Sequence, residues 1–161
     1  MANLAVTYSH QGKYEEAEEL ELKVLDVRKS VLGLEHPNTL TSMNNLAATY
    51  SQQGRYEEAG ELEVKVLGLH KKVLRPEHPD TLTIMANLAR IYSDQGKYEG
   101  AEELELKVLD LSKKVWGLEH PKTVHSMNNL ATIYVIQGKH KEARKLWMEM
   151  PNSGNPANLA N

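Results

Sequence analysis

The chain has 161 residues, of which 40% are hydrophobic and 25% charged, and its formal net charge is -3. It contains no cysteine, which excludes a disulfide framework and a thiolate metal site and favours the cytoplasm as its location. The mild negative charge argues against nucleic acid as a partner, because phosphate binding depends on clustered Lys and Arg. No apolar run is long enough to span a bilayer, so a membrane partner is not expected either.

A stretch of sixteen residues occurs four times, and each copy begins 42 residues after the one before. It reads ANLAVTYSHQGKYEEA from Ala2, NNLAATYSQQGRYEEA from Asn44, ANLARIYSDQGKYEGA from Ala86 and NNLATIYVIQGKHKEA from Asn128. Residues 43–84 and 85–126 are identical at 25 of 42 positions. Such identity is natural where each unit packs on a copy of itself. The predicted array covers residues 1–150, in units 1–42, 43–84, 85–126 and 127–150, with the first unit truncated at its start and the last at its end.

Each unit is predicted to hold two helices, because apolar residues recur at steps of three and four. Proline is tolerated in the first turn of a helix, so the first helices of the later units are expected to begin at Pro37, Pro79 and Pro121. A glycine able to take the left-handed conformation separates the two helices of every unit. These glycines are Gly12, Gly54, Gly96 and Gly138. The short turn makes the helices antiparallel neighbours, and the fold class is therefore all-α, a solenoid of helix hairpins.

The last unit breaks off at Pro151, and residues 151–161 have the small and polar composition of a disordered tail. No polar capping helix follows, although solenoids usually need one. An apolar end made by Leu146, Trp147, Met148 and Met150 is therefore predicted to seek a partner, which could be another copy of the chain.

The pattern Leu46-Ala47-x-x-Tyr50, followed by Gly54, Tyr56 and Ala59, resembles the signature of the tetratricopeptide repeat (TPR) family. At 42 residues the unit is longer than the usual 34. With its NNLA, QGKYEEAE and G-x-x-HP segments it is similar to the repeats of kinesin light chains, and more closely to those of fungal NLR-like (STAND) proteins. The resemblance implies a right-handed superhelix. One departure is a glutamate, at Glu21, Glu63 and Glu105, where many TPRs carry a large apolar residue, to which only Trp147 conforms.

Nothing in the sequence indicates an enzyme, a cofactor or a metal. The acidic run YEEAEELELK is interpreted as a solvated helix face, and His36, His78 and His120 are interpreted as loop or helix-capping residues, because equivalent positions one repeat apart cannot converge on one ion. The isolated glycines form no phosphate-binding loop.

One asparagine recurs at the same place in the first helix of every unit: Asn3, Asn45, Asn87 and Asn129. Asparagine is mildly unfavourable inside a helix, so four in register need a reason. One reading is a structural hydrogen bond between neighbouring helices. The other comes from the family resemblance, which places these residues in a concave groove, where their amides hold the backbone of a bound peptide. The same resemblance places further groove residues at Asn44, Asn128, Arg90, Asp94, Gln52 and His125, although Arg90 and Asp94 are also spaced to pair with each other.

The sequence therefore predicts a non-catalytic module that binds a protein or peptide segment in its groove. The alternative is a regulatory, sensing or self-associating segment of a larger NLR-like protein. RNA reading by helical repeats is disfavoured, because the expected groove lacks basic and stacking residues.

Overall fold

The computed structural model describes residues 2–151, and the predicted tail lies outside the described residues except for Pro151. Eight α-helices and no strand occur among the described residues, which confirms the all-α prediction. The chain forms two compact units, one ending at Arg75 and one beginning at Pro76, and each is described by itself. Within 2–151 no helix is both long and apolar enough to cross a membrane.

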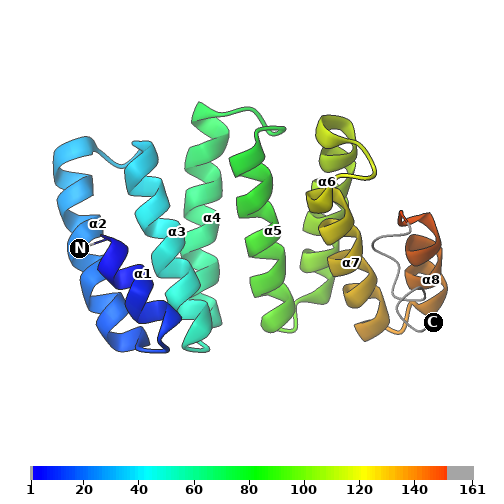
Figure 1. The fold of residues 1–161 in the computed structure, drawn as a ribbon, viewed down its shortest axis with the longest axis horizontal. Helices are drawn as coiled ribbons and strands as arrows, with labels where there is room; N and C mark the ends of the chain where they lie inside the picture. Colours follow the sequence, from blue (N-terminus) through cyan, green and yellow to red (C-terminus); the bar gives the residue numbers. More distant parts are fainter. Residues whose placement is uncertain (1, 152–161) are drawn as a thin grey trace. The chain divides into compact units, whose positions relative to one another are not determined.

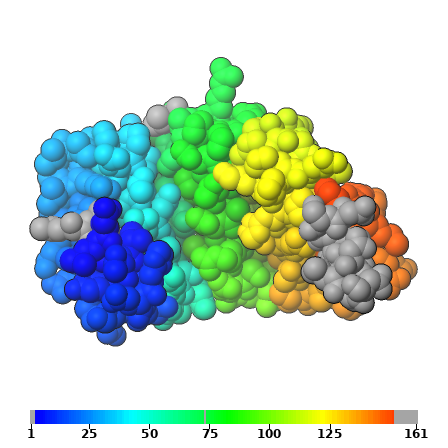
Figure 2. Space-filling model, in the orientation of Figure 1, coloured from blue at the N-terminus to red at the C-terminus, as the bar shows by residue number. Residues whose placement is uncertain are grey.

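Unit 1 holds two helix hairpins (Figure 1). They are formed by α1 (Ala2–His10), α2 (Tyr14–Leu32), α3 (Pro37–Gln52) and α4 (Tyr56–Val73). Each helix packs on the next, and α1 also touches α3, so the first helices of successive repeats are neighbours. Figure 2 shows α1 and α3 together on one face of this unit.

Unit 2 repeats the plan. It contains α5 (Pro79–Asp94), α6 (Tyr98–Trp116), α7 (Pro121–Ile136) and the short α8 (His140–Glu149). Consecutive helices pack on each other, and α5 also touches α7. The predicted starts at Pro37, Pro79 and Pro121 are confirmed.

The turn inside each hairpin depends on one glycine, as Gly54 illustrates. Its φ of 77° lies in the left-handed region. The Gly54 N–H donates to the Ser51 carbonyl at 3.1 Å, and the Arg55 N–H donates to the Tyr50 carbonyl at 2.9 Å. This pair of bonds is the Schellman motif, which satisfies carbonyls that the end of α3 would otherwise leave unpaired. The predicted role of the inter-helix glycines is confirmed.

The Glu-His-Pro loop caps the helix that follows it. In α3, α5 and α7 the histidine before the proline is the N-cap, and its Nδ1 accepts a hydrogen bond from the backbone N–H two residues on. The distances are 3.1 Å at His36, 3.2 Å at His78 and 3.2 Å at His120. The capping interpretation of these histidines is confirmed. No cluster of three or more potential metal ligands exists in the described part of the chain.

The predicted apolar end of the last repeat is partly wrong. Met150 is buried in a core cluster of unit 2 that includes Leu130 and Tyr134, and Leu146 and Trp147 pack against this cluster. Met148 alone of the four predicted residues is largely exposed, at 76%. The turn after α8 folds Met150 back because its apolar side chain gains more by covering α7 than by facing water.

Candidate functional site

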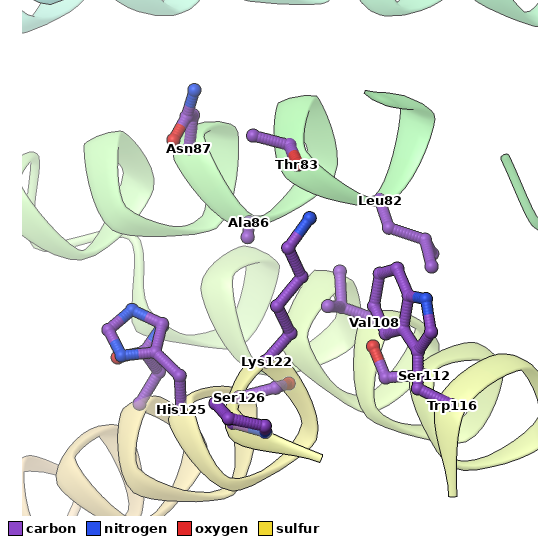
Figure 3. A pocket seen from close by; sticks show the side chains of 12 residues that line it. Leu82, Thr83, Ala86, Asn87, Val108, Ser112, Trp116, Lys122, His125 and Ser126 are labelled. Carbon is purple, nitrogen blue, oxygen red and sulfur yellow. The ribbon is translucent and has the colours of Figure 1, made fainter. Parts of the chain in front are cut away.

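A cleft of about 470 Å³ opens in unit 2 among α5, α6 and α7. Figure 3 shows Leu82, Val108 and Trp116 gathered toward one end, with Asn87 and His125 toward the other. The remaining lining residues are Thr83, Ala86, Ser112, Pro121, Lys122, Ser126 and Asn129. The cleft thus combines an apolar region with several amide and hydroxyl groups, a combination typical of sites that bind an organic group in a fixed orientation.

Three of the predicted groove residues, Asn87, His125 and Asn129, meet at this cleft. They come from the first helices of two successive repeats, α5 and α7. Asn87 and Asn129 are half-buried, whereas His125 is exposed. Sequence reasoning missed Ser112, Trp116, Lys122 and Ser126, because these positions differ among the repeats or look like ordinary surface polar residues.

The other predicted site residues lie apart from the cleft. Arg90 and Asp94 form an ion pair at 3.1 Å on the surface of α5, as the alternative reading allowed. Gln52 accepts a hydrogen bond from Ser9 at 2.7 Å, which links α1 to the end of α3. Asn3 is exposed on α1.

Two further predicted residues, Asn44 and Asn128, are half-buried on α3 and α7. The Asn44 Oδ1 atom is buried and has no hydrogen-bond partner among the described residues. Asn45, the next residue, lies on α3 beside a small hollow that it shares with Glu21, Val24 and Ser42.

The interpretation of the whole acidic run as a solvated face is wrong at one position per repeat. Glu21 is 5% exposed, and Glu63 and Glu105 are each 1% exposed. These are the glutamates that replace the large apolar residue of many TPRs. A buried carboxylate is costly unless hydrogen bonds compensate it, so its neighbours must be polar.

Glu105 meets that requirement through two residues that line the cleft. Ser126 Oγ donates to Glu105 Oε2 at 2.7 Å, and Asn129 Nδ2 donates to Glu105 Oε1 at 3.0 Å. Burial raises the pKa of the Glu105 carboxyl above its ordinary value, while these two hydrogen bonds lower it in part. The structural reading of the asparagine is therefore confirmed for Asn129, which bridges α7 to α6.

This bond also fixes which way the Asn129 amide faces. A carboxylate accepts hydrogen bonds and offers no proton, so the amide NH₂ must turn toward Glu105. The Oδ1 atom of Asn129 and the lone pairs of Ser126 Oγ are not used by these bonds, and both residues line the cleft. A structural bond and a binding role are compatible for the same side chain.

Unit 1 carries a related arrangement around Glu21. Burial raises the pKa of this carboxyl above its ordinary value, and a hydrogen bond with Thr49 lowers it in part. Here the serine equivalent to Ser126 is Ser42, which accepts a hydrogen bond at 2.7 Å from Arg28 Nη1. The glutamate is thus common to both units, whereas the partner of the serine differs.

Successive helix hairpins with equivalent turns and equivalent buried residues define an α-helical repeat protein. The family model of the tetratricopeptide repeat matches residues 1–72 and 53–114, and a second model of the same description matches residues 123–150. The chain belongs to the tetratricopeptide repeat family.

Two solved structures of a kinesin-light-chain-like protein from Podosopora anserina, with nearly identical TPR-like repeats, are similar to this chain. One is 35% identical with a TM-score of 0.86 and aligns with 92% of this chain and 70% of its own. The other is 34% identical with a TM-score of 0.87, over 99% of this chain and 79% of its own.

A more distant structure, BtubC (BKLC) from P. vanneervenii, shares the fold at 24% identity and a TM-score of 0.81, over 91% of this chain and 57% of its own. No curated protein is similar enough to count as a relative. The kinesin-light-chain-like resemblance is confirmed, and the resemblance to fungal NLR-like proteins stays a prediction.

Proposed function

We propose that this chain is a non-catalytic scaffold that binds a segment of a partner protein along the first helices of its repeats. The TPR fold itself suggests protein–protein interaction. The single observation that carries the proposal is the meeting of Asn87 and Asn129, from successive first helices, at one cleft. Asn3 and Asn45 are the equivalent residues of unit 1.

The chemistry of this cleft suits a polypeptide ligand. Leu82, Val108 and Trp116 offer apolar surface that a bound segment can cover, while the amide and hydroxyl groups fix the orientation of that segment. The proposal places this activity in the cytoplasm, with neither nucleic acid nor membrane as the partner.

Binding is tested with Asn87→Ala and Asn129→Ala, each immobilised beside the unchanged chain and exposed to extract from the source cell. Proteins retained by the unchanged chain are quantified by mass spectrometry, and the strongest is then titrated by calorimetry. Thr132→Ala is the matched control, because Thr132 is an exposed polar residue of α7 that bonds only to the Asn128 carbonyl in the described structure. We expect the two asparagine variants to lose the partner and the control to keep it. Equal retention by all three variants would refute binding at the cleft.

A second candidate is self-association, as expected for a regulatory segment of a larger NLR-like protein. It is favoured by exposed aliphatic residues in α2, where Val27 is 61% and Val31 74% exposed, and by the exposed Met148 of α8. Light scattering against concentration measures it directly. Mass that rises with concentration and falls on Val31→Ser would support this candidate, and a constant monomer mass would exclude it.

A further inference from the structure

One position near the equivalent serines Ser42 and Ser126 carries a different residue in each unit. Arg28 of α2 and Ser112 of α6 are 84 residues apart, which is two repeat lengths, so they occupy the same place in their repeats. The neighbouring positions correspond in the same way: Ser42 with Ser126, and Asn45 with Asn129.

In unit 1 the arginine is bound within the chain. Arg28 Nη1 donates to Ser42 Oγ at 2.7 Å and to the Asn38 carbonyl at 2.8 Å. The guanidinium group thus lies where α2 meets the first turn of α3, against the hydroxyl of Ser42, one helical turn before Asn45.

In unit 2 the equivalent position borders the open cleft. Ser112 is 1% exposed, its Oγ atom has no hydrogen-bond partner among the described residues, and it lines the cleft with Val108, Trp116 and Ser126 (Figure 3). A buried hydroxyl without a partner is rare and calls for an explanation. The position that corresponds to Arg28 thus lines the cleft in unit 2.

We propose that the cleft of unit 2 takes an arginine side chain of the partner protein, which supplies from outside the guanidinium that Arg28 supplies in unit 1. This inference rests on the proposed function, since it names the chemistry of the segment that the scaffold binds. Ser126 is the equivalent acceptor, and the Lys122 carbonyl is the equivalent of the Asn38 carbonyl.

The groups of the cleft match a guanidinium in three respects. Ser126 uses its one donor on Glu105, and Asn129 uses one of its two amide N–H groups there, so the hydroxyl oxygen and Oδ1 remain as acceptors, whereas a guanidinium has five donors and no acceptor. The Glu105 carboxyl contacts both residues and attracts a cation when it is ionised. The planar guanidinium also stacks on aromatic rings, and Trp116 lies at the cleft.

Two basic side chains oppose the guanidinium. The Lys122 ammonium lies 4.9 Å from the centroid of the Trp116 ring, and His125 is exposed nearby. His120 also stacks on Trp116, with ring centroids 5.1 Å apart, so an arginine competes with Lys122 for that ring. Lys122 is exposed and its long stem can turn to water, so its ammonium is displaced at small cost.

The test uses the whole chain and three small probes: N-acetyl-arginine amide, N-acetyl-citrulline amide and N-acetyl-glutamate amide. Citrulline keeps the shape of arginine and removes its charge, and glutamate reverses the charge. Binding is followed in ¹H–¹⁵N spectra at the amides of Ser112, Ser126 and Asn129. We expect arginine amide to bind about tenfold more tightly than citrulline amide, because hydrogen bonds from a charged donor are roughly twice as strong. Equal binding of the two, or tighter binding of glutamate amide, would overturn the proposal.

Two variants sharpen the result. Ser112→Arg restores the internal arginine, so it should abolish probe binding, and the new side chain should shift the signal of Ser126. Lys122→Ala removes the competing cation and should strengthen binding of arginine amide, while weaker binding would contradict the competition between Lys122 and arginine for Trp116.

The outcomes separate this inference from the proposed function. Loss of the cellular partner in Asn129→Ala together with no arginine preference would leave the scaffold function standing and reject the arginine.

Discussion

The hydrogen bond between Ser126 and Glu105 should contribute far more to stability than any surface ion pair of the chain. Both side chains are buried, at 2% and 1% exposure, and the Oγ to Oε2 distance is 2.7 Å. A double-mutant cycle with Glu105→Ala and Ser126→Ala isolates this bond, because the effect of each single change on other neighbours cancels. For a hydroxyl donating to a buried carboxylate we expect a coupling of about 2 kcal/mol.

The free energy of unfolding is measured in urea for the four proteins of the cycle. The matched control is Glu103 with Lys107, whose side chains are 71% and 56% exposed and 2.6 Å apart. An exposed pair with this spacing should couple by only about 0.3–0.5 kcal/mol. A coupling between Glu105 and Ser126 no larger than that of the control would refute the assignment of Glu105 as a hydrogen-bonded buried carboxylate.

The same cycle has a pH dependence whose sign follows from the raised pKa of Glu105. The folded chain holds this proton more tightly than the unfolded chain, so the contribution is fully present below the ordinary carboxyl pKa. It is lost as pH rises through the raised value. The unchanged chain should therefore lose stability relative to Glu105→Gln over that interval, while the coupling to Ser126 grows as the carboxylate ionises. If the free energy of unfolding of the unchanged chain rose with pH relative to that of Glu105→Gln, the burial of Glu105 would be contradicted.

Three further changes test the helices and turns of unit 1, each by urea unfolding. Gly68→Ala should stabilise the chain by about 1 kcal/mol, because Gly68 lies inside α4 and an added Cβ meets nothing within 4 Å. Gly54→Ala, with equally open surroundings, should instead destabilise it by about 1 kcal/mol because φ is 77°, and a neutral result would refute the left-handed turn. His36→Ala should lower the free energy of unfolding by about 1 kcal/mol through loss of the cap on α3, and His36→Asn should retain most of the stability. Equal loss in both variants would show that His36 does not stabilise the chain as an N-cap.

Most of the fold was accessible from the sequence, because its signals are local and repeated. A proline in the first turn and a glycine in the left-handed conformation are local signals of a helix boundary, so Pro37 and Gly54 mark the same boundaries in the sequence and in the structure. The 42-residue period then predicts that successive helix hairpins are equivalent. Met150 was mispredicted because its burial depends on a turn after α8 that no earlier repeat contains.

The candidate site was only partly accessible, because the glutamates of the second helix look alike in sequence. Glu103 and Glu105 stand two positions apart in one acidic run, yet the first is exposed and the second is 1% exposed. Two positions on a helix lie roughly 200° apart, so the run inevitably places one carboxylate toward α7 while others face water. The sequence does contain a signal for the burial of Glu105. Ala101 and Leu109 are each four residues from Glu105, so they lie on the same side of the helix, and both are buried.

A buried glutamate at the same position in every complete second helix gives the array a property that an apolar residue would not. An apolar side chain there would bury more area, but it would leave the NH₂ of Asn129 free to rotate. With Glu105 in place, one hydrogen bond holds the amide in one orientation and leaves its oxygen unused by that bond. The carboxyl thus occupies one of the two amide donors and leaves the amide oxygen as an acceptor. The residue at the neighbouring position differs between the units. In unit 1 Arg28 donates to the serine hydroxyl, whereas in unit 2 Ser112 lines an open cleft that a partner can enter.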